Sequence, residues 1–230
     1  MDDMADGSRF GGPAQRLPEA LEDPRRIALI VVDMQNDFVR VGAPLEVPAA
    51  RGTIGIIAEL ITVARAAAVP VLYTKFVGGT ERTLIWRFNP QIAAPTSFCV
   101  PGHQRTYGDA DGSLEVTDVI DELAPERGDP IIVKYGYDAF HQTNLADTLR
   151  AHGRDTLVIV GTVTQVCVES TARGAFHHQI RPVVVRDAVS STDDRLADAS
   201  LRTIELSFGD VVDASVVVQA FGAPLAAAAR

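Results

Sequence analysis

The sequence predicts an α/β fold: a three-layer α/β/α sandwich around a mostly parallel, Rossmann-like sheet. Short runs of consecutive apolar residues alternate along the chain with segments whose apolar residues recur at helical spacing. The apolar runs are not interrupted by polar residues, which is typical of strands buried on both faces of a parallel sheet. This alternation, without an internal repeat, indicates a sheet covered by helices on both sides.

The 230 residues are enough for one α/β domain with a substantial core. We expect residues 1–25 to form a polar N-terminal arm, mobile or lying on a neighbouring subunit, because its beginning is acidic and rich in glycine. Residues 26–230 are expected to form the single domain. The start of the chain has neither the basic region nor the apolar core of a signal peptide.

The first half of the chain predicts a strand–helix–strand unit. The strands cover residues 27–32 and 70–74, and the helix between them covers residues 53–68. Such a unit implies a parallel pair of strands joined by a right-handed crossover. Residues 76–112 are irregular but contain five aromatic residues, so we expect an ordered substrate-side lid or a subunit contact.

The second half of the chain continues the alternation. Predicted strands cover residues 131–133, 157–160, 183–185 and 210–212. Predicted helices cover residues 116–123, 143–151 and 193–207, with further helices starting at Cys167 and following the last strand. This order of elements is the one expected for a parallel sheet with helices on both faces.

Composition and charge disfavour several classes of partner. The formal net charge of −9 argues against nucleic acid and anionic membrane surfaces, and no apolar run is long enough to span a bilayer. The two cysteines, Cys99 and Cys167, cannot form a disulfide framework, so a reducing, cytoplasmic location is expected. A small-molecule substrate is the expected partner.

Three chemically reactive side chains follow apolar strands. Asp33 follows the first strand, Lys134 follows the strand at 131–133, and Cys167 follows a Gly- and Thr-rich turn after the strand at 157–160. Because the carboxyl ends of parallel strands lie at one edge of a sheet, these side chains are expected to meet there. A cysteine beside an ammonium and in the first turn of a helix is favoured as a thiolate, and an aspartate can accept and return its proton.

Each of these residues also has an ordinary structural interpretation. A cysteine alone is more often a small buried apolar residue, and an aspartate after a strand often caps a helix or a turn. A lysine at a strand end is often a surface residue. The three residues together favour a nucleophilic site.

Three motifs carry a resemblance to a known family. They are residues 28–38 (ALIVVDMQNDF), the pair Val133 and Lys134 followed by Tyr137 and Phe140, and residues 161–168 (GTVTQVCV). With these motifs the chain resembles the isochorismatase-like cysteine hydrolases over roughly residues 25–220. That family includes nicotinamidase, N-carbamoylsarcosine amidase, ureidoacrylate amidohydrolase and biuret hydrolase.

The resemblance implies the isochorismatase-like hydrolase fold and a role for each residue of the site. It implies that Asp33 is the general acid and base, Lys134 the cationic member and Cys167 the nucleophile. It also implies a cis peptide bond between Thr162 and Val163. The backbone N–H groups of Val163 and Cys167 would then form an oxyanion hole.

Two departures from the resembled enzymes narrow the expected activity. Residues 76–80 lack the Asp and two His that hold a metal in nicotinamidases, and isochorismatases that cleave a vinyl ether lack the cysteine present here as Cys167. We therefore expect an amidohydrolase without metal or cofactor, which cleaves a C–N bond of a small linear amide or ureido substrate through a thioester and releases ammonia. The alternatives are a vinyl-ether or lactam hydrolase and a non-catalytic relative that binds a ligand.

The likeness also suggests residues that contact the substrate. The run from Lys134 to Tyr137 is most similar to the branch of ureidoacrylate amidohydrolase, N-carbamoylsarcosine amidase and biuret hydrolase. We expect substrate contacts from Tyr137, Trp86, Phe38 and Gln104. Cys99 is expected to pack or to line the pocket, and Asp37 to anchor a loop. Since the resembled enzymes often form dimers or tetramers, a homodimer or homotetramer is expected.

Overall fold

The computed structural model describes residues 18–79 and 83–222 of the chain. Its centre is a six-stranded sheet with the order β5-β2-β1-β6-β7-β8, in which every neighbouring pair is parallel. The strands are β1 (Ile27–Val32), β2 (Val71–Phe76), β5 (Ile131–Lys134), β6 (Thr156–Thr162), β7 (Arg181–Ser190) and β8 (Asp210–Val212). The predicted Rossmann-like sheet is confirmed.

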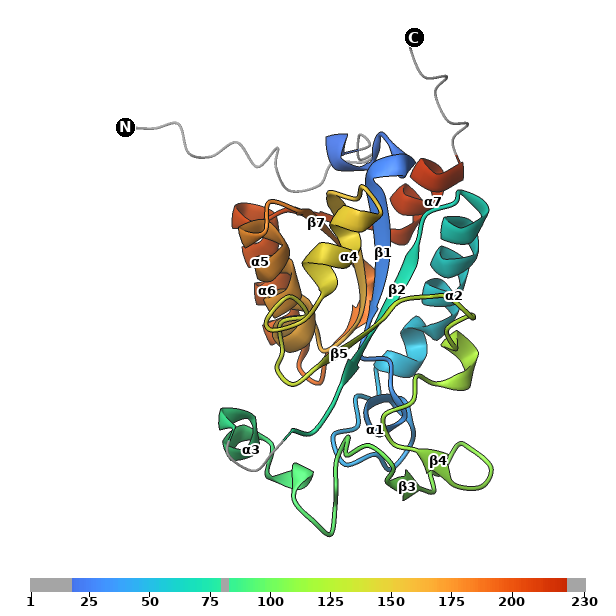
Figure 1. Ribbon diagram of the computed structural model, residues 1–230, viewed down its shortest axis with the longest axis vertical. Helices are drawn as coiled ribbons and strands as arrows, with labels where there is room; N and C mark the ends of the chain where they lie inside the picture. Colours follow the sequence, from blue (N-terminus) through green and yellow to red (C-terminus); the bar gives the residue numbers. More distant parts are fainter. Residues whose placement is uncertain (1–17, 80–82, 223–230) are drawn as a thin grey trace.

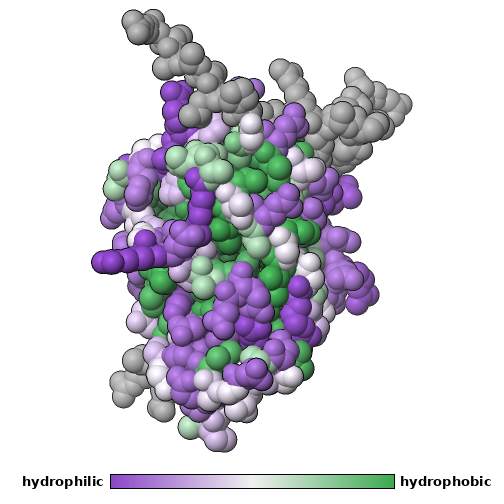
Figure 2. Space-filling model, turned by 90° about the vertical axis from the view of Figure 1, so that its right-hand side faces the viewer, coloured by the Kyte–Doolittle hydropathy of each residue, from purple (hydrophilic) through white to green (hydrophobic). Residues whose placement is uncertain are grey.

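Helices cover both faces of the sheet (Figure 1). One face carries α2 (Ala50–Ala66) and α7 (Ala214–Gly222), and the other carries α4 (Leu145–Ala151), α5 (Glu169–His177) and α6 (Asp194–Ser207). On the α2 side, hydrophilic residues cover much of the surface and hydrophobic residues are visible between them (Figure 2). In the described ranges, no helix has the length and apolar character needed to cross a membrane.

Strand β1 shows why the apolar runs of the sequence are continuous. All of its residues are buried. Ile27, Leu29 and Val31 belong to the core on the α2 side of the sheet. Ala28 and Ile30 belong to the core on the α5 side. Because successive side chains of a strand point to opposite faces, a strand between two cores needs an apolar residue at every position.

Irregular segments surround the end of the sheet at which the strands finish (Figure 1). The helix α1 (Asn36–Val39) follows β1, and α3 (Leu84–Phe88) follows β2. A short antiparallel hairpin pairs β3 (Gln104–Arg105) with β4 (Leu114–Glu115). Short 3-10 helices cover Pro90–Ile92 and Asp121–Leu123 in these segments, whereas those at Glu19–Leu21 and Pro24–Arg26 precede β1 and lie at the opposite end of the sheet. The irregular part of the chain therefore borders the edge where ligands bind in open parallel sheets.

The predicted helix at residues 116–123 is wrong. Only Asp121–Leu123 forms a single 3-10 turn. Before this turn the chain makes contacts across the fold, and the Val116 N–H donates to His103 O at 3.0 Å. A backbone group that is satisfied by a distant segment has no need of a helical partner.

Several other elements, including α2, α4, β2, β6 and β7, differ from the prediction by a few residues at their ends. The helix α4 begins at Leu145, because the Thr143 hydroxyl accepts the Leu145 N–H at 3.2 Å and takes the place of a preceding helical turn. Strand β7 continues well beyond the predicted 183–185 and reaches Ser190. The longer strand places Ser190 opposite the end of β6, where the segment that carries Cys167 begins.

The segment before β1 corrects the prediction of a mobile polar arm for the part that the structure describes. Residues 18–25 form short turns that pack on their own chain. Ala20 and Leu21 are buried in the core on the α2 side, and Leu21 is fully buried. Residues 1–17, the rest of the predicted arm, lie outside the described residues.

Candidate active site

The ends of three strands bring the reactive side chains to one edge of the sheet. Asp33 directly follows β1, Lys134 is the last residue of β5, and Cys167 lies in the turn after β6. Strands β1 and β6 are neighbours, whereas β2 separates β5 from β1. The long Lys134 side chain spans this distance, and its Nζ lies 5.4 Å from the centroid of the Phe76 ring at the end of β2.

The three side chains form a buried chain of contacts. Lys134 Nζ lies 2.7 Å from Asp33 Oδ2 and 3.4 Å from Cys167 Sγ. Asp33 and Lys134 are fully buried, and Cys167 is 4 % exposed. The Lys134 ammonium also donates to Gly136 O at 3.0 Å. The structure therefore brings the acid, the cation and the thiol together without intervening side chains.

Thr74, a buried residue of β2, holds Asp33 in place. The Asp33 N–H donates to Thr74 Oγ1 at 3.0 Å, and the Thr74 hydroxyl donates to Asp33 Oδ1 at 2.6 Å. In the described part of the chain, Oδ2 accepts no hydrogen bond of good geometry, although the Lys134 ammonium is in ion-pair contact with it. One carboxylate oxygen is thus fixed and the other is available. Sequence reasoning missed Thr74, whose one signal is its place near the end of the second strand.

Burial controls the charge of the cysteine. It raises the pKa of Cys167 to about 12, because a thiolate loses its hydration in the protein interior. The Lys134 ammonium lowers the pKa of the thiol, but the Asp33 carboxylate raises it again. The free site therefore holds a neutral thiol, and the expectation of a favoured thiolate is wrong.

The lysine of the same site is charged. Burial is the largest single effect and disfavours the Lys134 ammonium, but the charges and hydrogen bonds of Asp33 and Cys167 together outweigh it, and the pKa of Lys134 is raised. The site at neutral pH is thus a buried Asp–Lys ion pair in contact with a protonated thiol. Removing either charge would leave its partner buried and unpaired, which strongly lowers the free energy of unfolding.

The backbone that carries Cys167 leaves β6 through a tight turn. The peptide bond between Thr162 and Val163 is cis, as the resemblance implied. Residues Thr164–Val168 form a π-helical turn that precedes α5, so Cys167 does not lie in the first turn of an α-helix. Val163 O accepts the Val168 N–H at 3.2 Å across this turn. The turn runs directly into α5, so Cys167 lies in the first turn of a helix that is π-helical at its start.

Gly161 allows β1 and β6 to approach each other closely next to the site. Its φ of +113° lies in a region that L side chains rarely adopt. A Cβ at this position would lie 2.2 Å from Val32 O, which no side chain tolerates. Since Val32 immediately precedes Asp33, glycine at 161 keeps the acid and the cysteine turn side by side.

A cavity of about 240 Å³ lies beside Cys167. Its aromatic wall consists of Phe38, Phe76 and Phe98, whose ring centroids are 5.1, 5.9 and 6.3 Å apart. Val163 and other aliphatic residues complete the apolar lining. A mostly apolar cavity with a few polar groups is the usual form of a small-molecule site.

Apart from Tyr137, the polar lining comes from residues that the sequence did not single out. Asn89, Gln165 and Thr192 line the cavity together with Glu46 and Tyr137. Gln165 lies inside the cysteine motif, which was the one available signal for it. Within the described residues, no group of three or more His, Cys, Asp or Glu side chains is arranged to hold a metal ion.

Two of the four predicted substrate contacts line the cavity. Phe38 belongs to the aromatic wall. Tyr137 also lines the cavity, and its hydroxyl oxygen accepts a hydrogen bond from Asn89 Nδ2 at 3.0 Å. The Tyr137 hydroxyl proton is therefore free to be donated to a ligand.

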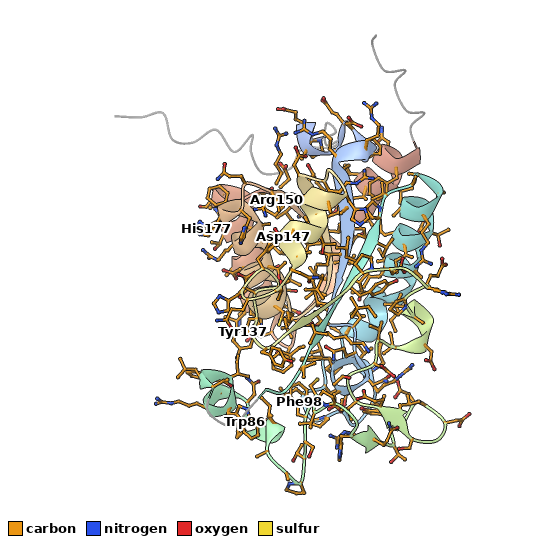
Figure 3. All side chains as sticks on the ribbon, viewed as in Figure 1. Trp86, Phe98, Tyr137, Asp147, Arg150 and His177 are labelled. Carbon is orange, nitrogen blue, oxygen red and sulfur yellow. The ribbon has the colours of Figure 1, made fainter. Side chains whose placement is uncertain are left out.

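The other two predicted contacts, Trp86 and Gln104, do not line this cavity. The Trp86 indole Nε1 donates to Gly79 O at 3.1 Å, which ties the ring to the segment after β2. In Figure 3, Trp86 lies on α3, beyond the strand ends near which Tyr137 and Phe98 are found. Gln104 is exposed on β3. Both residues belong to the irregular segment, where position in the sequence does not fix direction in space.

Asp37 anchors a loop, as expected. Its buried carboxylate accepts the Cys99 N–H at 2.9 Å, Arg105 Nε at 2.8 Å and the Tyr107 hydroxyl at 2.7 Å. Cys99 itself is buried in the core on the α2 side, where burial raises the pKa of its thiol. Because Phe98 lies directly before Cys99, these bonds also hold the aromatic wall of the cavity.

The fold and the site together define the class of the protein. Residues 27–216 match the Isochorismatase domain family. The chain belongs to this family.

Individual relatives narrow the class. The chain is 37 % identical to the ureidoacrylate amidohydrolase RutB of Methylobacterium radiotolerans, over 94 % of this chain and 88 % of that protein. It is 33 % identical to RutB of Rhizobium rhizogenes, over 86 % of this chain and 83 % of that protein. With the family, these relatives make the chain an amidohydrolase, a hydrolase of carbon–nitrogen bonds other than peptide bonds.

Solved structures give the same family. A cysteine hydrolase from Pseudomonas syringae pv. phaseolicola superposes with a TM-score of 0.79 at 29 % identity, covering 92 % of this chain and 98 % of that one. N-carbamoylsarcosine amidase from Thermoplasma acidophilum superposes with a TM-score of 0.62 at 31 % identity, covering 82 % and 96 %. The likeness thus extends over nearly the whole length of both proteins.

Proposed function

We propose that this amidohydrolase is cysteine-dependent: it cleaves a C–N bond of a small linear amide or ureido substrate through a thioester and releases ammonia. The observation that carries the proposal is the contact of Lys134 with both Asp33 and Cys167 beside a mostly apolar cavity. This arrangement supplies a nucleophile, a proton acceptor and a fixed positive charge to one small substrate.

The high pKa of the thiol decides how the nucleophile forms. Because burial raises the pKa of the Cys167 thiol, the neutral thiol predominates in the free site at pH 7. The proton must leave as sulfur attacks the carbonyl carbon. Asp33 Oδ2 has no hydrogen bond in the described residues and can take that proton, while Lys134 stabilises the charge that develops on sulfur.

The remaining steps return the proton to the leaving group. The tetrahedral intermediate carries its negative charge on oxygen, where the backbone N–H groups of Val163 and Cys167 would stabilise it. Asp33, now protonated, gives its proton to the leaving nitrogen, and ammonia departs as the tetrahedral intermediate collapses to the thioester. Asp33 then removes a proton from the water that attacks the thioester, the C–S bond breaks, and Asp33 returns the proton to sulfur as the acid product is released. A carbamic acid product would break down to carbon dioxide and a second amine.

The substrate class follows from the relatives and from the cavity. Two relatives bear the name ureidoacrylate amidohydrolase and a structural neighbour that of N-carbamoylsarcosine amidase. A ureido compound presents a planar carbamoyl group of the kind that the site would attack. Tyr137 and Phe38 are the proposed contacts, since Phe38 supplies an apolar surface and Tyr137 a hydroxyl donor.

The proposal is tested by an ammonia-release screen over small amides, ureido acids, biuret and nicotinamide. Cys167→Ala should abolish ammonia release and any covalent adduct seen by intact mass. Cys99→Ala provides a matched control, because Cys99 is buried in the core and its loss should leave an adduct on Cys167. Turnover that persists in Cys167→Ala would remove the mechanism, and release confined to vinyl-ether or lactam substrates would change the bond that is cleaved.

The likeness to the family also leads us to propose a cytoplasmic homodimer or homotetramer. Light scattering coupled to size-exclusion chromatography would measure the assembly. A monomer at micromolar concentration would contradict this part of the proposal.

A further inference from the structure

Gln165 lies in the π-helical turn two residues before Cys167 and lines the same cavity. Residues two apart on a helical turn do not face each other, so the Gln165 side chain meets a different part of the cavity from the sulfur. A substrate group that contacts Gln165 is therefore distinct from the carbonyl carbon that the sulfur attacks.

Ser191 fixes the direction of the Gln165 amide. The Ser191 hydroxyl donates to Gln165 Oε1 at 2.8 Å, and its oxygen also lies 3.0 Å from Asp193 O, a second acceptor for the same proton. Ser191 is buried and accepts the N–H of Asp193, the residue that caps α6, at 2.9 Å. Because Ser191 occupies Oε1, the amide nitrogen Nε2 points to the other side of the group. Among the described residues, Nε2 has no hydrogen-bond partner.

The surroundings of this amide are mainly apolar. Val163 and Val166 lie next to Gln165 in the turn and line the same cavity. In the described part of the lining, the one acidic or basic side chain is Glu46, which pairs with Arg51 at 2.8 Å. In such a cavity the apolar walls offer an N–H donor no acceptor. A hydrogen bond from this donor to an acceptor on the ligand therefore makes a larger contribution to the binding free energy.

We propose that Gln165 determines substrate specificity: its amide donates a hydrogen bond to an oxygen acceptor of the substrate outside the scissile group, and Ser191 positions it. The inference rests on the proposed amidohydrolase function. The acceptor is a carboxylate or a second carbonyl oxygen, both of which accept an N–H group. Small amides and ureido compounds that carry such an oxygen are preferred to those that end in an alkyl group.

Three probes of equal length distinguish a carboxylate acceptor from a carbonyl acceptor and from an alkyl end without an acceptor. They are 3-ureidopropionate, 3-ureidopropionamide and N-propylurea, which end in a carboxylate, a carboxamide and a methyl group. Gln165→Glu keeps the size of the side chain and an oxygen for Ser191 but removes the donor. Its kcat/KM for 3-ureidopropionate should fall by about 10- to 100-fold, whereas that for N-propylurea should change by less than about twofold. Gln219→Glu, the same change on the exposed face of α7, serves as the control and should alter neither value.

The carboxamide probe identifies the acceptor. A loss confined to 3-ureidopropionate assigns a carboxylate, and a comparable loss for 3-ureidopropionamide assigns a carbonyl oxygen. An equal loss for all three probes, or no loss for any, would overturn the role of Gln165.

Ser191 is tested as a positioning residue. Ser191→Ala should raise the KM for 3-ureidopropionate and leave kcat nearly unchanged, and Ser191→Thr, which keeps the hydroxyl, should restore the KM. Thr203→Ala removes an exposed hydroxyl from α6 and is the matched control. A fall in kcat for all probes alike, without a change in KM, would show a merely structural role.

A binding measurement separates this inference from the proposed function. The Cys167→Ala variant should be stabilised against heat by 3-ureidopropionate, and adding Gln165→Glu should remove most of that shift. If the wild-type protein releases no ammonia from any probe, the proposed function fails, while a Gln165-dependent shift still supports the inference. A shift that does not depend on Gln165, or no shift in either variant, contradicts it.

Discussion

Replacing Thr74 with valine should disable the site without creating a cavity. Valine keeps the shape of threonine but removes the hydroxyl that joins Asp33 N to Asp33 Oδ1. A hydrogen bond to a charged group contributes about 1.5–3 kcal/mol, and an unsatisfied buried N–H costs about 1–3 kcal/mol. Since both losses arise at one buried residue and are not fully additive, we expect Thr74→Val to lower the free energy of unfolding by about 3 kcal/mol.

Calorimetry measures this change directly. For a chain of this size, 3 kcal/mol corresponds to a fall in Tm of about 6–12 °C. Thr62→Val is the control, because the Thr62 hydroxyl is exposed on α2 and bonds only to Ala58 O, so that its loss should cost less than about 0.5 kcal/mol. Equal melting temperatures for the two variants would refute the role given to Thr74. The kcat of Thr74→Val should also fall at least about tenfold, because the carboxylate loses its fixed direction.

Two further predictions concern pH and backbone. Because burial raises the pKa of Cys167 from 9.0 in the unfolded chain to about 12, its contribution to stability is complete below pH 9 and is lost as pH rises towards 12. By pH 10 the loss should be on the order of 1 kcal/mol, and thermal melts between pH 7 and 10 should show it in the wild type and not in Cys167→Ala. Gly161→Ala should lose more than about 3 kcal/mol in urea titrations, since its Cβ would collide with Val32 O. Gly55→Ala is the control, because nothing lies within 4 Å of the new Cβ on α2. This variant should gain about 0.5–1 kcal/mol in the free energy of unfolding. A similar loss of stability in both variants would show that steric contact is not the cause.

The sheet was predictable because its determinants are local and repeated. Continuous apolar runs such as Ile27–Val32 are typical of strands covered on both faces, and the two cores around β1 show that both of its faces are covered. The segment at 116–123 was not predictable in this way. Its apolar residues suit a helix, but its N–H groups are taken by a distant part of the chain, as at Val116.

The reactive residues were predictable from their place at strand ends, but their supports were not. Asp33, Lys134 and Cys167 are residue types with distinctive chemistry, and a parallel sheet aligns its strand ends. Thr74 and Ser191 are common polar residues whose importance arises only from a neighbour in space. Their hydrogen bonds to the site leave no pattern in the sequence.

The charge of the thiol was predicted wrongly for a related reason. The sequence shows a lysine and a helix near Cys167, and both favour a thiolate. It does not show that the closed fold leaves the cysteine only 4 % exposed, and desolvation then dominates. Burial is a property of the whole fold and cannot be assigned from the flanking residues.

Strand β5, which ends at Lys134, lies at one edge of the sheet. Within the described sheet, β5 is the outermost strand on its side and pairs only with β2, and Ile131 and Val133 are 44 % and 45 % exposed. Such edge strands open at a lower free energy than the central ones. Opening of β5 would withdraw Lys134 from the site and Ile132 from the core on the α5 side, while β1 and β6 remain paired. We therefore expect local opening of β5 to inactivate the enzyme on heating. Activity should be lost at a lower temperature than the one at which the whole fold melts.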